Sequence, residues 1–388
     1  MSKRAPKLTR RLNPGAGPKY VKIYELLKYD IEQGRLPNAR YLPPENRMAE
    51  EFGVSLGTVK KALAMLKAEN YVQRRKGDGT WVSYTRASAR DSRAIVVLMG
   101  DIAQSFHGEI YRGVQQVLSE RGYKPILIDT RSSAEREREC LVEYGPQVGG
   151  LLVVPADSNN NHAAYGSLLS DRTPFVFMDR FLRELNVDAV VADNVKGGYL
   201  ATKHLLELGH RRIAVTGVRG STSIMDRVEG YRSALAEFGV PFDEGLLSRA
   251  KETGYLAGYE LAETAIAARP DVTAAFCLRD DAAWGCMQRL SELGVSVPGD
   301  VSLVGYDDNR DICDRLRPTL TTVRQPRAEV GSKAAEMLIA RLERRTQDAP
   351  AVTKLPVEFV LRESTAKPRK SARKSARKRA RGKHAPSR

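Results

Sequence analysis

The sequence predicts an α/β protein in two parts: a small basic N-terminal domain of helices with a hairpin, and a larger domain of two doubly wound lobes. Two patterns predict this fold class. Between residues 19 and 84, three segments carry apolar residues at helical spacing, and two short alternating runs follow. From residue 94, short apolar runs alternate with amphipathic segments, which is the pattern of parallel strands joined by right-handed helical crossovers.

Length and composition exclude several classes of protein. The 388 residues fit two or three domains. No apolar run reaches the ~18 residues of a membrane-spanning helix, and no apolar segment follows the basic start, so we expect no membrane partner and a cytoplasmic location. The four cysteines lie far apart, without a histidine at ligand spacing, so no metal site and no cofactor are expected.

Charge is distributed unevenly along the chain. The formal net charge is +16, and residues 1–13 and 367–388 hold five and eleven basic side chains without an acidic one. Residues 1–18 and 367–388 therefore read as a disordered basic arm and a disordered basic tail, which suit sequence-independent phosphate contacts or, for the tail, solubility alone. The residues between them carry no net charge overall, so the polyanion partner is expected at the ends and at the small basic domain.

The first helix of the small domain is expected after residue 18. Val21, Tyr24, Leu27 and Ile31 repeat at intervals of three and four, and Gly34 ends the pattern.

The second and third helices follow closely. Pro44 can open the second helix at its first position, where the missing N–H costs nothing. Ser55 is a good N-cap for the third, and Val59, Leu63 and Leu66 give that helix an apolar stripe. The runs "YVQRR" and "TWVSY", joined by "KGDG", then predict a hairpin with a glycine-rich basic tip.

Three helices and a two-stranded wing in about 65 residues form a winged helix-turn-helix domain, which we assign to residues 19–84. This stretch resembles the DNA-binding domain of the gluconate-repressor (GntR) family. The similar features are the Leu42-Pro43 turn, the Gly53-Val54-Ser55 elbow, Thr58-Val59 followed by a basic residue, and the Gly-x-Gly-Thr wing that begins at Gly77. The resemblance implies that the helix after Ser55 reads DNA.

Residues 85–93 read as a flexible linker, and residues 94–366 as the two-lobed domain. In this larger domain "VVADNVKGGYLATKHLLELGHRRIAV", "VPGDVSLVGYDD" and "LRPTLTTVRQPRAEVGSKAAEMLIARLE" resemble the effector domain of the lactose and galactose repressor (LacI/GalR) family. That resemblance implies a periplasmic-binding-protein-like fold that binds a small effector and dimerises. A GntR-type head on a LacI-type body is similar to the arabinose-repressor architecture of some bacteria.

Candidate DNA contacts are polar, basic or glycine positions on the second and third helices and at the wing: Asn46, Arg47, Ser55, Thr58, Lys60, Lys61, Lys76 and Gly77. The family commonly has Arg and Thr where this chain has Leu56 and Gly57, and Arg in place of Asn46. This departure removes side chains suited to guanine edges. Leu56 could contact a thymine methyl group, and Asn46 could pair with an adenine.

Candidate effector contacts lie where the predicted strands end, because ligands of doubly wound sheets bind beyond the carboxyl ends of strands: Asp101, Phe106, Asp179, Arg180, Arg227, Arg279, Asp280 and Asp307. Carboxylates accept from vicinal hydroxyls and arginine donates in a fork, so this mixture suits a sugar or a sugar acid. The family resemblance supports Asp179, Arg227, Asp280 and Asp307. Arg279 departs from it and could favour an anionic ligand, while Asp193 is assigned to helix capping.

The sequence therefore predicts a ligand-responsive transcriptional regulator that binds operator DNA as a homodimer. We expect a repressor of a carbohydrate-utilisation operon, controlled by a sugar or sugar acid. No catalytic triad, phosphate-binding glycine loop or metal cluster is evident in the sequence, so an enzyme is not expected, and no catalytic residue is assigned. The alternatives are a cytoplasmic solute-binding protein and a nonspecific architectural DNA-binding protein driven by the basic tails.

Overall fold

The computed structural model describes residues 18–32, 35–36, 41–69, 71–75, 79–83, 91–102, 105–156, 161–216, 220–248, 253–343 and 348–369. The chain divides into two compact units, and along the linker the division falls between Ser92 and Arg93. The predicted basic arm, nearly all of the predicted basic tail, and the wing residues Lys76 and Gly77 lie outside the described residues.

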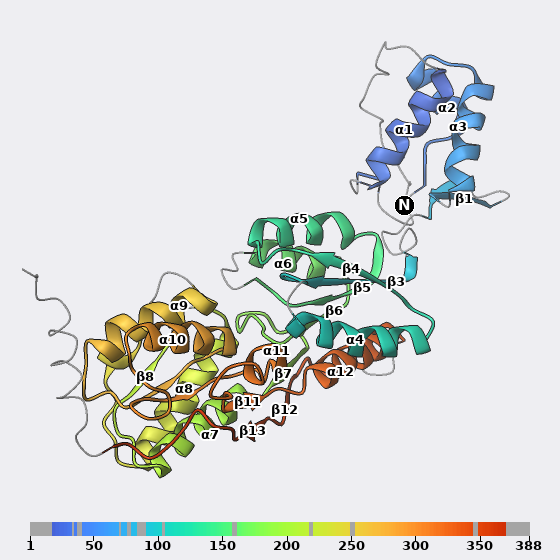
Figure 1. Cartoon of the computed structure of the whole chain (residues 1–388). Helices are drawn as coiled ribbons and strands as arrows, with labels where there is room; N and C mark the ends of the chain where they lie inside the picture. Colours follow the sequence, from blue (N-terminus) through green and yellow to red (C-terminus); the bar gives the residue numbers. More distant parts are fainter. Residues whose placement is uncertain are drawn as a thin grey trace, which may run out of the picture. The chain divides into compact units, whose positions relative to one another are not determined.

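The N-terminal unit is a winged helix-turn-helix domain, as predicted. Its elements are α1 (Lys19–Glu32), α2 (Glu45–Phe52), α3 (Leu56–Ala68), β1 (Val72–Arg75) and β2 (Gly79–Val82), with the two strands antiparallel (Figure 1). Ile23, Leu27, Met48, Val59 and Leu66 form its core. The predicted stripe of α3 is buried in this core, whereas in α1 Val21 stays outside the cluster and Ile23, which the predicted spacing did not include, lies inside it.

The turn between α2 and α3 follows from three residues. Gly53 has a φ of +60°, which glycine adopts without strain, and it ends α2. The Ser55 hydroxyl accepts from the Thr58 amide at 3.3 Å, which confirms the predicted N-cap of α3. The prediction for Pro44 was one residue off: α2 begins at Glu45, and the extended ψ of Pro44 (143°) leaves that residue outside the helix as its N-cap.

The N-terminal lobe of the larger unit contains a six-stranded sheet of order β12-β7-β6-β5-β3-β4. Figure 1 shows α5 and α6 on one face of this sheet and α4 and α12 on the other. The elements are β3 (Asp91–Met99), α4 (Ser105–Glu120), β4 (Lys124–Asp129), α5 (Ala134–Tyr144), β5 (Val148–Val153), α6 (His162–Ser170), β6 (Phe175–Met178), β7 (Ala189–Ala192), α12 (Arg327–Leu342) and β12 (Val352–Leu355).

The C-terminal lobe contains a three-stranded parallel sheet of order β10-β9-β8, with α7 and α8 packed on one face and α9 and α10 on the other. A further pair, β11 and β13, is antiparallel. The elements are α7 (Asn194–Glu207), β8 (Ile213–Val215), α8 (Thr222–Glu237), η1 (Glu244–Leu246), α9 (Gly254–Leu261), η2 (Ala262–Ala267), β9 (Ala274–Phe276), α10 (Asp280–Glu292), β10 (Ser302–Val304), α11 (Arg310–Cys313), β11 (Thr322–Arg324) and β13 (Glu358–Val360).

The chain passes between the two lobes after β7, after β11 and after β12 within the described residues. Asp193 occupies the first crossing, where its side chain accepts from the Lys196 amide and caps α7, as predicted. Two features differ from the sequence analysis. Strand β3 begins at Asp91, inside the predicted linker at 85–93, because residues 91–93 continue the extended run that leads into the buried strand, and β12 joins the edge of the first sheet beside β7.

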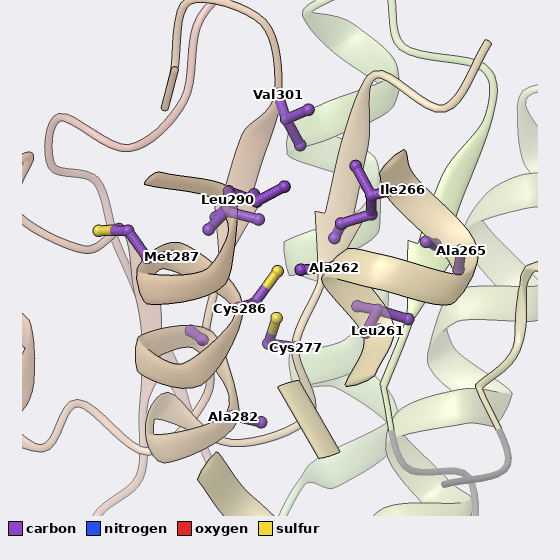
Figure 2. Close-up of a cluster of buried hydrophobic side chains, with 14 of the residues drawn as sticks. Leu261, Ala262, Ala265, Ile266, Cys277, Ala282, Cys286, Met287, Leu290 and Val301 are labelled. Atoms are coloured by element: carbon purple, nitrogen blue, oxygen red, sulfur yellow. The ribbon is translucent and has the colours of Figure 1, made fainter. Parts of the chain in front are cut away.

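The cysteines are buried and reduced. Figure 2 shows Cys277 and Cys286 inside the apolar cluster between α9, α10 and the sheet, together with Leu261, Ile266 and Leu290. Cys140 and Cys313 are buried as well. Burial in an apolar cluster explains these residues as packing groups, in agreement with the sequence analysis. In the part of the chain that the structure describes, no helix is long and apolar enough to cross a bilayer.

Three helix pairs in the larger unit meet at reciprocal glycines. A Cβ on Gly230 of α8 would lie 2.0 Å from the Val195 carbonyl oxygen of α7, and one on Gly198 of α7 would lie 2.0 Å from the Arg227 carbonyl oxygen of α8. The same relation joins α4 to α12 through Gly113 and Gly331, and α9 to α10 through Gly258 and Gly285. Each pair therefore packs backbone against backbone, at a distance that admits no side chain.

Replacing Gly230 with Ala is expected to lower the melting temperature of the larger unit by about 5 °C or more, because overpacking against a rigid backbone costs about 1–3 kcal/mol. Gly166 of α6 is the matched control, since a Cβ there has no atom within 4 Å. Gly166→Ala should leave the melting temperature unchanged or slightly raised. Differential scanning calorimetry of the full chain measures both, and equal melting temperatures for the two variants would contradict the close-packing argument.

Candidate effector site and DNA-binding surface

A cavity of about 490 Å³ lies between the two lobes of the larger unit, beyond the carboxyl ends of their strands. The two lobes touch at its margin, where the Thr222 hydroxyl donates to the Phe181 carbonyl at 3.1 Å and Arg183 pairs with Asp226. The cavity is lined by Phe106, His107, Ser132, Asp179, Arg180, Ser221, Ser223, Ile224, Arg227, Arg279, Asp280, Asp281, Asp307, Asn309, Asp311 and Ile312.

Seven of the eight predicted effector residues line this cavity: Phe106, Asp179, Arg180, Arg227, Arg279, Asp280 and Asp307. Asp101 does not. It follows β3 in a turn with a φ of +23°, and its backbone carbonyl accepts from His107 Nδ1 at 3.0 Å. The residue that reaches the cavity from this turn is therefore His107, which the sequence analysis did not select.

The other residues missed by the sequence analysis belong to loops and helix starts. Ser221 and Ser223 lie at the start of α8 and were not selected from the sequence. Asn309, Asp311 and Ile312 follow the Asp307-Asp308 pair at the start of α11. Their position after a predicted strand end was the available signal, because neighbours of one strand-end residue share the same edge of the sheet.

Arg227 is the most constrained cation of the cavity. Its side chain is 4% exposed, and its guanidinium lies 3.7 Å from the centre of the Tyr306 ring. Nε donates to Asn194 Oδ1 at 2.9 Å, Nη1 donates to the Leu278 carbonyl, and Nη2 lies 3.4 Å from Asp307 Oδ1. Contacts from α7 and from the segments that follow β9 and β10 thus fix this side chain before any ligand binds.

Each arginine of the cavity has an aspartate partner that also lines the cavity. Arg180 Nε lies 3.0 Å from Asp179 Oδ2, Arg279 Nη2 lies 2.8 Å from Asp281 Oδ2, and Arg227 pairs with Asp307. Asp280 and Asp311 add two further carboxyl groups. The wall therefore carries no surplus of positive charge, and the sequence-based suggestion that Arg279 favours an anionic ligand loses its basis.

Three aspartates at strand ends have left-handed backbone conformations: Asp179 (φ +65°), Asp307 (φ +115°) and Asp308 (φ +52°). Such conformations are sparsely populated for residues other than glycine and are retained where surrounding contacts enforce them. For Asp307 those contacts are Gln325 Nε2, which donates to Oδ1 at 2.7 Å, and Arg327, which donates to the backbone carbonyl. The turn at Asp307 is therefore held by side chains from outside the cavity.

Asp280 lines the cavity, but both of its carboxyl oxygens bond to the protein. The Thr322 hydroxyl donates to Oδ1 at 2.6 Å, and the Asn309 amide donates to Oδ2 at 2.7 Å. Cys313 Sγ lies 3.2 Å from Oδ2. Asp280 thus ties α10 to α11 and β11, and its contact with a ligand stays a prediction. Burial and the neighbouring Asp307 carboxylate raise the pKa of Asp280 to about 7.

This raised pKa predicts a pH dependence of stability. Unfolded Asp280 ionises above about 3.8, whereas the folded residue keeps its proton until about pH 7, so its contribution to the free energy of unfolding falls as the pH rises between these values. Asp280→Asn removes the ionisation, and we expect a flatter curve for this variant over that range. Urea unfolding of both proteins at intervals from pH 4.5 to 8 measures the difference, and identical pH slopes would contradict the prediction.

The described part of the head presents one exposed polar face on α3. Lys60 and Lys61 are exposed, and Leu56, at the start of the helix, is 36% exposed. The Ser55 and Thr58 hydroxyls lie 2.8 Å apart and bond each other, so both are engaged in the cap in the absence of DNA. The first turn of α3 therefore offers Leu56 and the lysines as its most available groups.

The second helix presents two further predicted residues. Asn46 is exposed on α2, while Arg47 is half-buried and pairs with Glu51 at 2.9 Å. Arg74 of β1 lies 3.2 Å from Glu45 and ties the wing to the start of α2. The pair engages Nε of Arg47 and leaves the Nη groups as the donors that could contact a phosphate.

A second surface of note lies on α9 and α10. Leu256 is 56% exposed and Trp284 is 45% exposed, and the Tyr255 ring contacts the Trp284 ring edge-on with centroids 5.2 Å apart. Beside them, Arg289 pairs with Glu263 and Glu292, and the Tyr259 hydroxyl donates to Glu292. An aromatic centre bordered by a fixed polar network is the anatomy of a protein–protein interface.

Fold and site together define a ligand-responsive DNA-binding regulator, and comparison with known proteins gives the family. Residues 19–82 match the model of the bacterial regulatory proteins of the gntR family, and residues 202–365 match that of the periplasmic binding protein-like domain. The arabinose metabolism transcriptional repressor of Geobacillus stearothermophilus is 32% identical over 90% of this chain and 98% of its own length. The chain belongs to the family of transcriptional repressors that join a GntR-type head to a LacI-type effector domain.

Other relatives and solved structures share the effector domain. The HTH-type transcriptional repressor PurR of Vibrio atlanticus is 33% identical over 65% of this chain and 75% of its own length. A LacI family transcriptional regulator from Enterococcus faecium with bound ribose covers 71% of this chain and all of its own, with a TM-score of 0.62 and 32% identity. A transcriptional regulator CelR–cellobiose complex covers 83% of this chain and 99% of its own, with a TM-score of 0.64 and 29% identity.

Proposed function

We propose that this protein represses a carbohydrate-utilisation operon and that a neutral sugar in the cavity between the lobes controls its affinity for operator DNA. The pairing of each cavity arginine with its own aspartate carries this proposal. A sugar acid or phosphate would meet the negative charge of those carboxylates, whereas a neutral polyol can bond them as they are.

The carboxylates leave room for such bonds. Oδ2 of Asp179 and Oδ1 of Asp307 are engaged by protein donors, while the second oxygen of each has no hydrogen-bond partner among the described residues. Two such acceptors suit vicinal hydroxyls, and Phe106 supplies an aromatic face for the apolar side of a sugar ring. A volume of about 490 Å³ lies within the usual range of small-molecule sites. The names of relatives and structures that mention arabinose, ribose and cellobiose agree with this chemistry.

The test uses the full chain and a panel of L-arabinose, D-ribose, D-gluconate and adenine. Thermal shift and isothermal titration calorimetry identify binders, and footprinting on the promoter of a neighbouring operon measures operator occupancy with each. We expect a neutral sugar to bind and to change occupancy. If only D-gluconate or only adenine binds, the neutral-sugar proposal is wrong.

For DNA, we propose that the head reads its operator through Asn46, Leu56 and Lys60, with the other predicted head residues as supporting contacts. Lys60 is exposed on α3. Lys60→Ala should reduce operator affinity by about tenfold and lower the slope of log K against log[salt] by about one, because one phosphate contact is lost. Lys67, exposed in the last turn of α3, is the matched control. An equal loss in Lys60→Ala and Lys67→Ala would refute a specific role for the start of the helix.

We also propose that the protein acts as a homodimer joined through the α9–α10 face. In a two-fold symmetric dimer, the same surface patch of each copy contacts its equivalent on the other copy. The exposed Trp284 and Leu256 give this patch an apolar centre. Two copies present two heads to two half-sites, which raises operator affinity without a new type of DNA contact.

A further inference from the structure

His107 is a buried cavity residue with one nitrogen committed and one free. It lies in the first turn of α4, is 5% exposed, and its ring meets the Phe106 ring edge-on with centroids 5.3 Å apart. Nδ1 lies 3.0 Å from the backbone carbonyl oxygen of Asp101. A carbonyl oxygen only accepts, so Nδ1 carries the proton of this hydrogen bond.

The second nitrogen, Nε2, has no hydrogen-bond partner among the described residues and is shielded from solvent. Burial, followed by the positive charge of Arg180, lowers the pKa of His107, so the imidazole is neutral near pH 7. Because Nδ1 carries the proton, Nε2 has a free lone pair and can only accept a hydrogen bond. A buried polar atom without a partner is costly and therefore marks a place where a partner is missing.

His107 lines the cavity, so we expect the missing partner of Nε2 to come from a ligand in the cavity. The charges that act on the imidazole belong to Asp179, Arg180 and Arg279, which all line the cavity together with His107. A ligand in the cavity therefore lies on the side from which His107 lines it. An anionic oxygen has no proton to give to this nitrogen, whereas a hydroxyl has one.

We infer that His107 is a specificity-determining residue of the effector site, whose Nε2 accepts a hydrogen bond from one hydroxyl of the sugar. This inference rests on the proposed function, because it describes how the same cavity binds one hydroxyl of the proposed sugar. A bond to His107 Nε2 favours sugars that carry a hydroxyl donor at this position over sugars that lack one. It also disfavours sugar acids that place an anionic oxygen there.

The first test needs no ligand. Nitrogen NMR of the full chain, labelled with ¹⁵N-histidine, reports the protonation of each imidazole, and comparison with His107→Phe identifies the His107 resonances. We expect a neutral imidazole with its proton on Nδ1 at pH 7, and a shift of the Nε2 resonance when a binding sugar is added. An imidazolium, a proton on Nε2, or an Nε2 resonance that ignores every bound compound of the panel would overturn the inference.

The second test pairs variants with ligand analogues. L-arabinose, D-ribose and their monodeoxy analogues are titrated into wild type, His107→Phe and His107→Gln by calorimetry. We expect one deoxy analogue to lose about tenfold in affinity for wild type and to lose nothing further for His107→Phe, with His107→Gln intermediate because its amide oxygen still accepts. His162 of α6 does not line this cavity, and His162→Phe should discriminate the analogues as wild type does.

The two tests together show which of the two proposals has failed. If neither sugar binds wild type, the proposed function fails, and the Nε2 resonance measured with whichever other compound of the panel binds then decides the role of His107. If a sugar binds and His107→Phe weakens every analogue by the same factor, the proposed function stands and the inference about His107 is wrong.

Discussion

Replacing Arg227 with Met should reduce effector affinity by about 100-fold or more while operator binding without effector stays within about twofold of wild type. The Arg227 guanidinium donates to Asn194 and Leu278 and pairs with Asp307, so it joins three segments of the C-terminal lobe beside the cavity. Methionine retains the length of the side chain but no donor, and each hydrogen bond to a charged group is worth about 1.5–3 kcal/mol. Calorimetry with the sugar that binds wild type measures the first quantity, and footprinting measures the second.

Arg232 is the control for this variant. It lies on the same helix, α8, is exposed, and its guanidinium packs over the Phe242 ring away from the cavity. Arg232→Met should bind the sugar as wild type does. Normal sugar affinity in Arg227→Met would remove Arg227 from the site, and loss of operator binding in the same variant would point to misfolding, which its melting temperature detects.

Replacing Trp284 with Arg should convert the dimer to a monomer and lower operator affinity by about 100-fold or more. The substitution removes a large apolar side chain and sets two cations against each other across a two-fold contact, and buried tryptophans at such contacts often carry 2 kcal/mol or more. Losing the link between two heads then forfeits the gain from binding two half-sites, which reaches 10²–10⁴. Sedimentation velocity gives the oligomeric state, and a gel-shift titration gives the affinity.

Leu169 of α6 provides the matched control, because it is an apolar residue with the same 45% exposure on a different helix. Leu169→Arg should remain dimeric and bind operator normally. A Trp284→Arg protein that stays dimeric would refute the α9–α10 interface, and a monomer that binds operator as tightly as wild type would refute the need for two heads.

The architecture and seven of the sixteen residues that line the cavity were predictable because both depend on local sequence patterns. Apolar runs such as residues 94–99 are buried on both faces of a sheet, so they mark a strand and its carboxyl end without tertiary information. Side chains that directly follow such ends lie at the carboxyl edge of their own sheet. The cavity lies between the carboxyl edges of the two sheets, which is why Asp179 and Asp307 line it from different lobes.

The other features of the cavity depend on three-dimensional contacts that the sequence pattern does not contain. Whether Asp101 or His107 reaches the cavity is decided by the backbone turn after β3, whose carbonyl holds the histidine ring. Asp280 looked like a ligand contact because of its position, but three donors from residues more than 25 positions away occupy its carboxyl oxygens. The wing tip at Lys76 and Gly77, and the tail, stay predictions from sequence.

The reciprocal glycine contacts have a mechanical consequence for signalling. Helices that meet backbone to backbone have no flexible side chains between them to absorb a displacement, so each pair moves as one body. Gly198 of α7 abuts the Arg227 carbonyl of α8. A shift of Arg227 therefore displaces α7 directly, because no side chain between the two backbones can adjust. Within the described residues, the three crossings between the lobes are therefore the segments at which we expect strain from a bound ligand to be relieved.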